Sequence, residues 1–400
     1  MRLTRAGGPE PPLAELRDAV EEGVERWLAA SGDVRLEDVH RWALLPSGKL
    51  LRPLLLLTST GVVGGRYEQV LPVAVGVELA HVASLVHDDI IDNDDLRRGR
   101  ASVRHRFGTA HAILGADSLF FALFQQLGEC RRRGVPNRAV VEVMELLARA
   151  GREAASGVVL EMALSGRPAT PTAADGNDGQ APGRGDGQVA GADDGQAAGG
   201  DGDGQVAAYV EMVRLKSASL LRAACHAGAV LGGATRAQAE VLSQYGQALG
   251  IAFQIRDDLL PYRHGPRQTD KPPESDLRNQ RPALPLLLAH RMGTPADRTL
   301  LAALADEYDG AAEGEAGEER ARHERVRRLV EETGALQEAH RMAQEHVDAC
   351  HRALAALPSG RDRDLLASLA EQLAAEGDAG SDMGSSPAAR TGVRAKTPLS

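Results

Sequence analysis

The chain has few aromatic residues, few cysteines and little sign of β-structure. Only 3% of its 400 residues are aromatic, whereas 43% are hydrophobic, and Ala, Leu and Val supply most of that share. These aliphatic residues favour helices and helical cores, so a large all-helical domain is expected. Because no segment alternates apolar and polar residues with β-branched enrichment, no sheet is predicted.

Cysteine usage and the lack of targeting signals suggest a compartment. Cys130, Cys225 and Cys350 are odd in number, widely spaced and without a CxxC partner. That pattern fits a reducing environment, so the cytoplasm is predicted. The first residues lack the apolar core of a signal peptide, and no uninterrupted apolar run is long enough for a bilayer. Stable membrane insertion is therefore not expected.

The net charge of −10 argues against general nucleic-acid binding. Much of it lies in residues 171–205, where seven Asp against Arg184 give −6 and leave the rest of the chain near −4. The triplet Asp-Gly-Gln recurs there, and its spacing does not match the calcium-binding nonapeptide repeat. Glycine and aspartate in this number do not bury a core, so residues 166–206 are predicted to be a disordered insert.

Helical periodicity covers most of the remaining chain. Residues 1–375 are predicted to form one domain, followed by a disordered tail at 376–400, with a polar loop at 263–280. Individual helices are predicted over 12–30, 48–62, 70–92, 108–128, 136–164, 207–233, 236–260 and 281–292, and the chain from there to about 375 is also expected to be helical.

Carboxylates cluster in the segment HDDIIDNDDLRRGR at residues 87–100. On a helix Asp88 and Asp92 project from one face, one turn apart, with Asp89 beside them. Like charges at that spacing destabilise a helix, and a divalent metal is the compensating reason that the pattern favours. Mg²⁺ prefers oxygen ligands and often bridges carboxylates to a phosphate. Forked donors that suit a diphosphate follow at once, from Arg97, Arg98 and Arg100.

A second carboxylate pair, Asp257 and Asp258, lies in GIAFQIRDDLLPY. Gln254 precedes the pair by three and four residues and shares its helical face. Apolar neighbours indicate a largely buried helix, and buried carboxylates need partners or a metal. The two acidic clusters are therefore expected to face each other across a cavity and to share bound metal ions.

Basic residues occur at several positions flanked by apolar ones. Lys49 and Arg52 lie three residues apart in GKLLRP, Lys216 lies in YVEMVRLKSASLL, and Lys271 and Arg281 flank a polar loop. A lone lysine is usually a solvated stem, which is the ordinary reading of each. Taken together, these groups are expected to bind two diphosphates.

These segments resemble the trans-polyprenyl diphosphate synthases, the polyprenyl synthetase or isoprenoid synthase type I family, and among them the geranylgeranyl diphosphate synthases. The resemblance is strongest over residues 40–290. Three motifs together are specific to this family: the first aspartate motif with the RRG that follows it, GKxxRP and FQxxDD. The resemblance implies an all-α helical bundle around a central active-site cavity, commonly as a homodimer. The matching segments, in order, are GKLLRP, ELAHVASLVHDDIIDNDDLRRGRAS, GVVLEM, LKSASLLRAA, FQIRDD and KPPESDLRNQRPALPLLLA.

The resemblance also implies a role for each matching residue. The diphosphate of isopentenyl diphosphate would be held by Lys49, Arg52, His81 and Arg98. Mg²⁺ on the allylic diphosphate would be bound by Asp88 and Asp92, with Asp89 in support, and a further Mg²⁺ by Asp257. The allylic site would be lined by Arg97, Lys216, Ser217, Gln254 and Lys271. Outside the family match, His81 on an apolar helix would usually be a core histidine, and His87 an orienting partner of the carboxylates.

The second motif departs from the family's DDxxD, because Pro261 stands where the last Asp is usual. Proline lacks an N–H and clashes with the carbonyl of Asp257, four residues back, so the helix is expected to kink or end there. One metal-directed carboxylate is lost, which predicts slower or more strongly metal-dependent catalysis. Arg281 stands where many relatives carry Lys, which preserves the charge.

Small residues, Ala83 and Ser84, precede Asp88 by about one helical turn. In the family a bulky aromatic near this position stops chain growth at the farnesyl length. The resemblance therefore implies a geranylgeranyl or longer product, and Ala83→Phe is expected to shorten it. Three aromatic residues follow further along the chain, Phe120, Phe121 and Phe124. They are predicted to pack in the core, and the alternative is that they form the floor of the product pocket.

The favoured function is Mg²⁺-dependent condensation of isopentenyl diphosphate with an allylic diphosphate to give a polyprenyl diphosphate. The metal would neutralise the departing diphosphate, and apolar helices would keep water from the allylic cation. A terpene cyclase on the same scaffold is one alternative, although it needs no isopentenyl diphosphate site. A non-catalytic regulatory subunit is another, and the altered second motif is its support. A helical scaffold protein would leave the buried charges unexplained.

Overall fold

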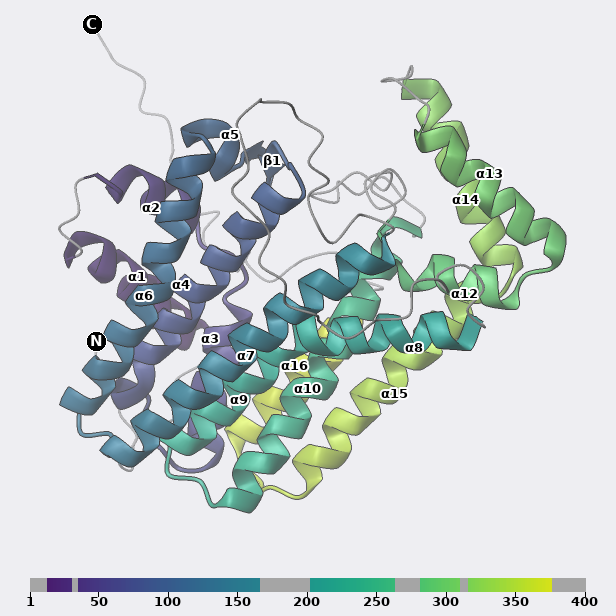
Figure 1. Cartoon of the computed structure of the whole chain (residues 1–400). Coiled ribbons are helices and arrows are strands. Elements are labelled where there is room, and N and C mark those ends of the chain that lie inside the picture. The colour runs from purple at the N-terminus through teal and green to yellow at the C-terminus, as the bar shows by residue number, and fades with distance from the viewer. Residues whose placement is uncertain (1–12, 31–34, 166–201, 263–280, 310–315, 376–400) are drawn as a thin grey trace, which may run out of the picture.

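The computed structural model describes residues 13–30, 35–165, 202–262, 281–309 and 316–375, and the described part is a bundle of helices with one small hairpin (Figure 1). This confirms the all-α prediction. The helices are α1 (Leu13–Ala30), α2 (Glu37–Leu44), α3 (Leu51–Val62), α4 (Tyr67–Ile91), α5 (Val103–Phe107), α6 (Thr109–Arg132), α7 (Asn137–Leu164), α8 (Gly202–Val213), the π-helical turn η1 (Arg214–Ala218), α9 (Ser219–Leu231), α10 (Arg236–Leu259), the 3₁₀ turn η2 (Leu260–Tyr262), α12 (Leu284–Met292), α13 (Pro295–Asp309), α14 (Ala316–Glu332), α15 (Ala335–Ala355) and α16 (Arg361–Ala375).

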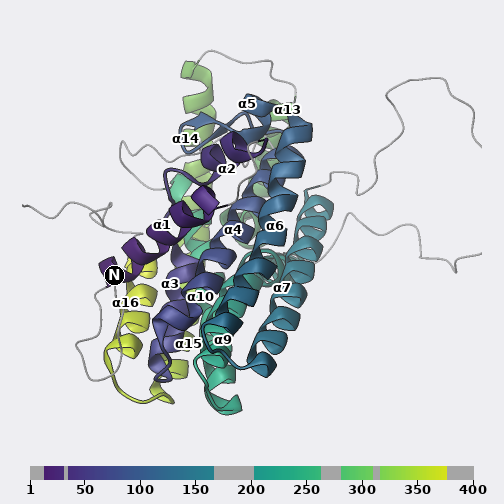
Figure 2. The same cartoon turned by 90° about the vertical axis from the view of Figure 1, so that its left-hand side faces the viewer.

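Long helices pack side by side along most of the bundle (Figures 1 and 2). Helix α4 packs along α6, α3 along α9, and α10 lies against both α9 and α15. Helices α9 and α3 approach closely, since a Cβ on Gly228 would come within 2.1 Å of the Leu56 carbonyl oxygen. Thr60 donates its hydroxyl hydrogen to the Gly228 carbonyl at 2.9 Å, which ties the two helices. This packing positions the ends of α4, α7 and α10, where the carboxylates lie.

Helix α4 is the most apolar of the long helices. By length and composition it is long enough to cross a membrane, and 72% of its most apolar window is buried inside the bundle. A helix that is hydrophobic on every side is either a core helix or a membrane span. Its neighbours α3 and α6 cover it here, which is the arrangement of a core helix.

Helix α10 begins and ends where its sequence directs. Thr235 and Gln238 form a reciprocal capping box at its start. The α-helix ends at Leu259 and passes into η2, which contains Pro261. The predicted effect of this proline on the helix is therefore confirmed.

A two-stranded hairpin follows α4, so the expectation of no β-structure was wrong at this point. Strands β1 (Leu96–Arg97) and β2 (Arg100–Ala101) pair in antiparallel register, with Leu96 opposite Ala101. The loop residues Arg98 and Gly99 have φ of 52° and 73°. Positive φ at both central residues is the geometry of a type I′ turn, whose twist matches a hairpin. Two-residue strands are too short to show an alternating pattern.

Other boundaries also differ from the predictions. The short helices α2 and α5 were not predicted, because eight and five residues carry too little periodicity. Helix α8 begins at Gly202, so the part of the insert from 202 to 206 is helical and was wrongly assigned to a disordered loop. Asp203 pairs with Arg291 at 3.2 Å, and Val206 is buried, which stabilises this first turn. The insert from 166 to 201, the loop at 263–280 and the tail lie outside the described residues.

Two of the three phenylalanines of α6 are not in the core, so that prediction was wrong for them. The side chains of Phe121 and Phe124 are 70% and 47% exposed, whereas Phe120 packs partly against the core. The reason is the direction of the buried face of α6, where Leu119 and Leu123 point toward α4 and leave the opposite face to solvent.

Candidate active site

The carboxylates of the first acidic cluster lie at the carboxyl-terminal end of α4, next to the hairpin (Figure 1). Asp88 is half-buried and Asp89 is fully buried. Burial raises the pKa of Asp88, while the nearby Lys216 works against that shift. Each of these groups meets a cation from another element, so the like charges are compensated rather than left to repel.

Asp89 is held by the hairpin. Arg97 donates from Nε and approaches with Nη2, each 2.6 Å from Asp89 Oδ1. Burial raises the pKa of Asp89 to about 6, and the Arg97 guanidinium limits the rise. This contact fixes the hairpin on α4 and removes one oxygen of Asp89 from other use.

Asp92 forms an ion pair with Arg281, a residue far from it in the sequence. The Arg281 guanidinium lies 2.5 Å from Asp92 Oδ2, and the two side chains are 13% and 15% exposed. Arg281 lies three residues before α12. The structure therefore brings Arg281 to the first acidic cluster. Lys271, the other basic residue predicted near this loop, lies outside the described residues.

A cluster of cationic residues lies on the other side of the hairpin turn from the first acidic cluster. Arg98 packs on the GKLLRP segment, since a Cβ on Gly48 would come within 2.4 Å of its Nη2. Lys49 is exposed beside it, and Arg52 is half-buried on the first turn of α3. Burial lowers the pKa of Arg52 to about 10, although Glu78 and Asp88 oppose this. The positive charges of Arg52 and Arg98 also lower the pKa of His81 on α4.

His81 is held neutral. Burial first, and then the three arginines Arg52, Arg98 and Arg97, lower its pKa well below the usual value. Its Nδ1 is buried and has no hydrogen-bond partner among the described residues. A neutral imidazole with an unsatisfied ring nitrogen suits a hydrogen bond to a bound polar group better than the fully satisfied core position that is its ordinary reading.

Glu78 belongs to this cationic cluster and was not predicted. It lies on α4, three residues before His81, and is 4% exposed. Burial raises its pKa, while Arg52, Arg98 and Arg17 lower it. A buried carboxylate among arginines keeps their charges compatible with burial. Its position one helical turn before His81 is the signal that could have identified it.

Lys216 lies in the π-helical turn η1 between α8 and α9. Its ammonium pairs with Glu161 of α7, and although burial lowers the pKa of Lys216, Glu161 and Asp88 together raise it. A Cβ on Gly157 would lie 2.3 Å from the Lys216 backbone nitrogen, so the glycine permits this close approach. Single π-turns inside helices often mark functional sites. Glu161, in the segment GVVLEM, is a second residue that was not predicted.

A hydrogen-bonded chain links Ser217, Gln254 and Asp258. Ser217 Oγ donates to Gln254 Oε1 at 2.8 Å, and Gln254 Nε2 donates to Asp258 Oδ1 at 3.0 Å. Asp258 Oδ2 accepts from the Tyr209 hydroxyl at 2.6 Å and from the Leu284 backbone N–H at 3.0 Å. Burial first, and then Asp258, raise the pKa of Tyr209 well above its usual value. The chain joins α8, η1, α10 and the start of α12.

Asp257 differs from its neighbour in exposure. Its side chain is exposed, whereas that of Asp258 is 9% exposed. Among the described residues, no three His, Cys, Asp or Glu side chains gather closely enough to hold a metal alone. The expected sharing of metal ions between the two acidic clusters stays a prediction. Carboxylate oxygens on two helices, with Asp88 and Asp257 accessible, still fit Mg²⁺ that bridges to a diphosphate.

His87 turns away from the carboxylates of α4. Its Nε2 lies 3.4 Å from Asp117 Oδ1 on α6, and its ring packs on Phe120 at a centroid distance of 5.6 Å. It therefore joins α4 to α6 instead of orienting Asp88 or Asp89.

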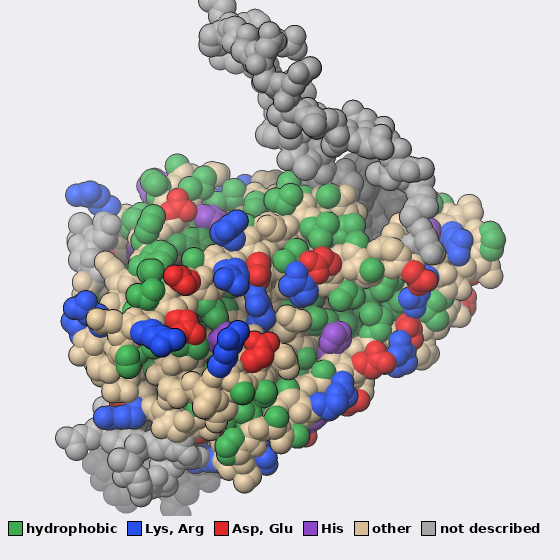
Figure 3. Space-filling view, turned by 60° about the horizontal axis from the view of Figure 1, so that its bottom comes forward, with side chains coloured by type: hydrophobic (Ala, Val, Ile, Leu, Met, Phe, Trp, Pro, Cys, Tyr) green, Lys and Arg blue, Asp and Glu red, His purple; other side chains and the backbone are tan. Residues whose placement is uncertain are grey.

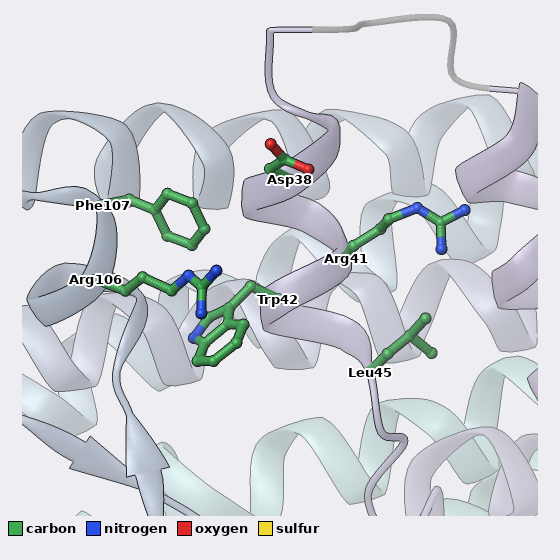
Figure 4. Close-up of a pocket in the computed structure, with 6 residues that line it drawn as sticks. All are labelled: Asp38, Arg41, Trp42, Leu45, Arg106 and Phe107. Carbon is green, nitrogen blue, oxygen red and sulfur yellow. The ribbon is translucent and has the colours of Figure 1, made fainter.

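A pocket of about 290 Å³ lies outside this site, between α2 and α5 (Figure 4). The Arg106 guanidinium lies 3.7 Å from the centroid of the Trp42 ring, and Trp42 Nε1 donates to the Ala101 carbonyl at 2.9 Å. Arg100 in turn donates to the Trp42 carbonyl oxygen. The pocket contains none of the predicted site residues, and its tryptophan anchors the hairpin that carries Arg97 and Arg98.

Comparison with known proteins gives this arrangement a family context. The family model described as polyprenyl synthetase matches residues 34–317. The chain is 34% identical to a farnesyl diphosphate synthase of Geobacillus stearothermophilus over 283 residues, which are 69% of this chain and 83% of that protein. It is 31% identical to a geranylgeranyl diphosphate synthase of Methanosarcina mazei over 278 residues, covering 70% and 74% of the two chains.

Comparison with solved structures supports the same family. A crystal structure of a polyprenyl synthase from Caulobacter crescentus, complexed with calcium and isoprenyl diphosphate, superposes with a TM-score of 0.71 at 29% identity. The superposition covers 93% of this chain and 99% of that one. The likeness extends over helices on both sides of the insert.

Proposed function

The chain belongs to the polyprenyl synthetase family and is a prenyltransferase, and on that premise we propose that it joins isopentenyl diphosphate to an allylic diphosphate with the help of Mg²⁺. The observation that carries the proposal is the hairpin after α4. Its two adjacent arginines serve different clusters, because Arg97 contacts Asp89 and Arg98 packs on Gly48. Two neighbouring anion sites are what a reaction between two diphosphates requires.

The allylic diphosphate with its Mg²⁺ is assigned to the acidic side. Asp88 and Asp92 on α4 and Asp257 on α10 would hold the metal, and carboxylates on different helices suit an ion that completes its shell with water and phosphate oxygens. When bound, the metal neutralises the leaving diphosphate. Lys216 adds a fixed positive charge near Asp88, and Arg97 keeps Asp89 in place.

Isopentenyl diphosphate is assigned to the cationic cluster of Lys49, Arg52, His81 and Arg98. The neutral His81 would donate a hydrogen bond without adding charge, while the arginines supply paired N–H donors. Glu78 would hold the cationic cluster together before the substrate binds. The two substrates then lie on opposite sides of the hairpin turn.

The apolar helices would protect the reaction from water. Below Asp88, the half-buried stripe of α4 includes Ser84 and Leu85, and the packed core lies behind it. Excluding water prolongs the life of an allylic cation and leaves the alkene of the second substrate as the nucleophile. We propose a geranylgeranyl or longer product, because Ser84, on the half-buried face one turn before Asp88, is small, while Ala83, which was predicted to share this role, is buried in the core.

We further propose that the functional unit is a homodimer in the cytoplasm. Helices α6 and α7 lie side by side (Figure 2), and both carry exposed apolar residues, which define what we call their outer face. An exposed apolar patch of this kind marks an interaction surface. Three free, buried thiols, Cys130, Cys225 and Cys350, fit a reducing compartment. The residues of the outer face are Ile113, Leu114, Phe121, Phe124, Val141, Met144 and Val159.

The assignment of two substrate sites is tested by measuring KM for each substrate separately in two variants. Lys49→Gln should raise KM for isopentenyl diphosphate by about tenfold, the cost of one charge-assisted hydrogen bond, with little change for the allylic substrate. Lys216→Gln should do the reverse. If both variants raised the same KM, or if neither changed, the assignment would be wrong.

A further inference from the structure

Asp257 and Asp258 are neighbours on the last turn of α10, yet their surroundings are opposite. Asp258 is 9% exposed, and its two oxygens accept hydrogen bonds from Gln254, Tyr209 and Leu284. Asp257 is exposed. We propose that Tyr209 and Asp258 are positioning residues that aim Asp257 at the metal, and that Asp258 is not itself a metal ligand.

The hydrogen bonds leave Asp258 poorly suited to bind a metal. Its Oδ2 accepts from a tyrosine hydroxyl at 2.6 Å and a backbone N–H at 3.0 Å, which occupies both lone-pair directions of that oxygen. Its Oδ1 accepts from Gln254 Nε2, whose own oxygen is engaged by Ser217. A metal at Asp258 would have to displace one of these donors.

The position of the pair at a helix end explains why such a tie is needed. The last turn of an α-helix lacks part of its hydrogen bonding, and α10 ends at Leu259, just before Pro261. Successive side chains on a helix point about 100° apart, so fixing Asp258 toward α8 fixes the direction of Asp257. Tyr209 thereby acts on Asp257 through its neighbour.

The same carboxylate also organises the other side of the site. The Leu284 N–H that Asp258 accepts belongs to the first residue of α12. Arg281 lies three residues earlier and reaches Asp92 at 2.5 Å. Asp258 therefore holds the segment whose arginine meets the first acidic cluster, which links α10 to α4 through α12.

The test compares two buried tyrosine–aspartate pairs. Tyr67 donates to Asp362 at 2.8 Å, both residues are buried, and Tyr67 begins α4, at the opposite end of that helix from Asp88. Tyr209→Phe and Tyr67→Phe each remove one hydroxyl, so each should lower the melting temperature. Only Tyr209→Phe should raise the Mg²⁺ concentration for half-maximal turnover, by about tenfold, as for other side chains that orient metal ligands. Equal Mg²⁺ half-saturation in both variants would overturn the proposal.

A second comparison holds even if Tyr209→Phe does not fold. In Asp258→Asn, the amide oxygen keeps the bonds from Tyr209 and Leu284, and a flip of the Gln254 amide restores the third. Its Mg²⁺ half-saturation should therefore stay within about twofold to threefold of the wild type, whereas Asp257→Asn should raise it by tenfold or more. Equal effects of the two substitutions would make Asp258 a ligand and end the proposal.

This inference rests on the proposed Mg²⁺ dependence of the enzyme. The two fail in distinguishable ways. Wild-type turnover that is insensitive to chelation of Mg²⁺ would contradict the proposed function itself. Wild-type turnover that requires Mg²⁺, with Tyr209→Phe matching Tyr67→Phe, would contradict the positioning role alone.

Discussion

Single residues decide how much charge the site can present to a metal. Pro261 lies in η2, immediately after α10, where the family pattern has a further aspartate. The proline ends the helix and leaves Asp257 as the exposed carboxylate of that motif, since Asp258 is turned inward. In the proposed site, metal binding therefore depends more on Asp88 and Asp92 of α4.

Restoring the missing carboxylate should ease metal binding. Pro261→Asp is expected to lower the Mg²⁺ concentration for half-maximal turnover several-fold, about 1 kcal/mol for one additional charged ligand. Steady-state rates over a Mg²⁺ titration measure this, with circular dichroism to check that the helix end has not rearranged. An unchanged Mg²⁺ dependence would contradict the role given to Pro261.

The pKa of Asp89, raised to about 6 by burial, makes folding stability depend on pH. Between its unfolded value and about pH 6 the folded state holds a proton that the unfolded chain has lost. Stability from this group is therefore greatest at low pH and is lost as the pH rises through that window. The loss is at most about 3 kcal/mol, for a shift of roughly two pKa units.

Asp89→Asn removes this titration, so the variant should lack that part of the decline. Urea unfolding at pH 4.5 and pH 7 measures it, as the difference between wild type and variant at each pH. The difference should change in favour of Asp89→Asn as the pH rises. A constant difference would show that Asp89 titrates alike in the folded and unfolded states.

At the scale of elements, close backbone approach sets the position of Lys216. A Cβ on Gly157 of α7 would lie 2.3 Å from the Lys216 nitrogen and 2.7 Å from its Cα. Gly157→Ala must therefore push η1 away and is expected to cost 1–3 kcal/mol, about the range for overpacking, and to raise KM for the allylic substrate. Kinetics and thermal unfolding measure the two effects.

Gly151 is the matched control for this prediction. It lies on the same helix, and a Cβ there would meet nothing within 4 Å. Gly151→Ala should leave KM unchanged and stabilise the protein slightly, because alanine favours the helix by about 1 kcal/mol. If Gly157→Ala behaved like Gly151→Ala, the close approach would not position Lys216.

The face of α4 below Asp88 sets product length in this account. Ser84 is one turn before Asp88 on the same face and is half-buried, whereas Ala83 is fully buried in the cluster that faces α6. Ser84→Phe should therefore shorten the product, while Ala83→Phe should mainly cost stability, about 1–3 kcal/mol through overpacking. Chromatography of dephosphorylated products measures chain length. An unchanged product in a folded Ser84→Phe variant would contradict the pocket assignment.

Element by element, length and packing explain what could be predicted from sequence. The long helices α1, α4, α6, α7 and α10 were predicted because their apolar periodicity is sustained, and the end of α10 was predicted from Pro261. The hairpin, α2 and α5 are too short for such a pattern. The first turn of α8 could not be predicted because Asp203 and Val206 are stabilised by tertiary contacts with residues far along the chain.

The site itself divides in a similar way. The motifs identified the groups that meet at the hairpin, including Asp88, Lys49 and Arg52. They did not identify Glu78, Glu161 or Tyr209, because each acts through a partner on another element, and only Glu78 had a local signal, its place one helical turn before His81. The resemblance assigned a metal to Asp257 and none to Asp258, but the hydrogen bonds that hold Asp258 toward Tyr209 and Leu284 could be found only from the fold.

For the whole molecule, the outer face of α6 and α7 is the surface expected to hold two copies together. Figure 3 shows one face of the molecule, on which charges of both signs lie among the apolar side chains. Phe121 is 70% exposed on that outer face, and Met292 on α12 is 44% exposed away from it. Phe121→Asp should weaken the dimer by about 2 kcal/mol or more, as for an interface anchor, and Met292→Asp should not.

Sedimentation velocity across a concentration series measures the difference. The wild type and Met292→Asp should sediment as dimers, and Phe121→Asp should dissociate at concentrations where they do not. A wild type that stays monomeric at high concentration would contradict the use of this face by a second copy.

The central claim is that this chain extends an allylic diphosphate with isopentenyl diphosphate, and one assay tests it. The purified protein is incubated with isopentenyl diphosphate, an allylic primer and Mg²⁺, and the products are identified by mass and chain length. The account predicts linear prenyl diphosphates longer than the primer, formed only when both substrates and Mg²⁺ are present. Cyclic hydrocarbon from the primer alone, or no product from a folded protein, would contradict it.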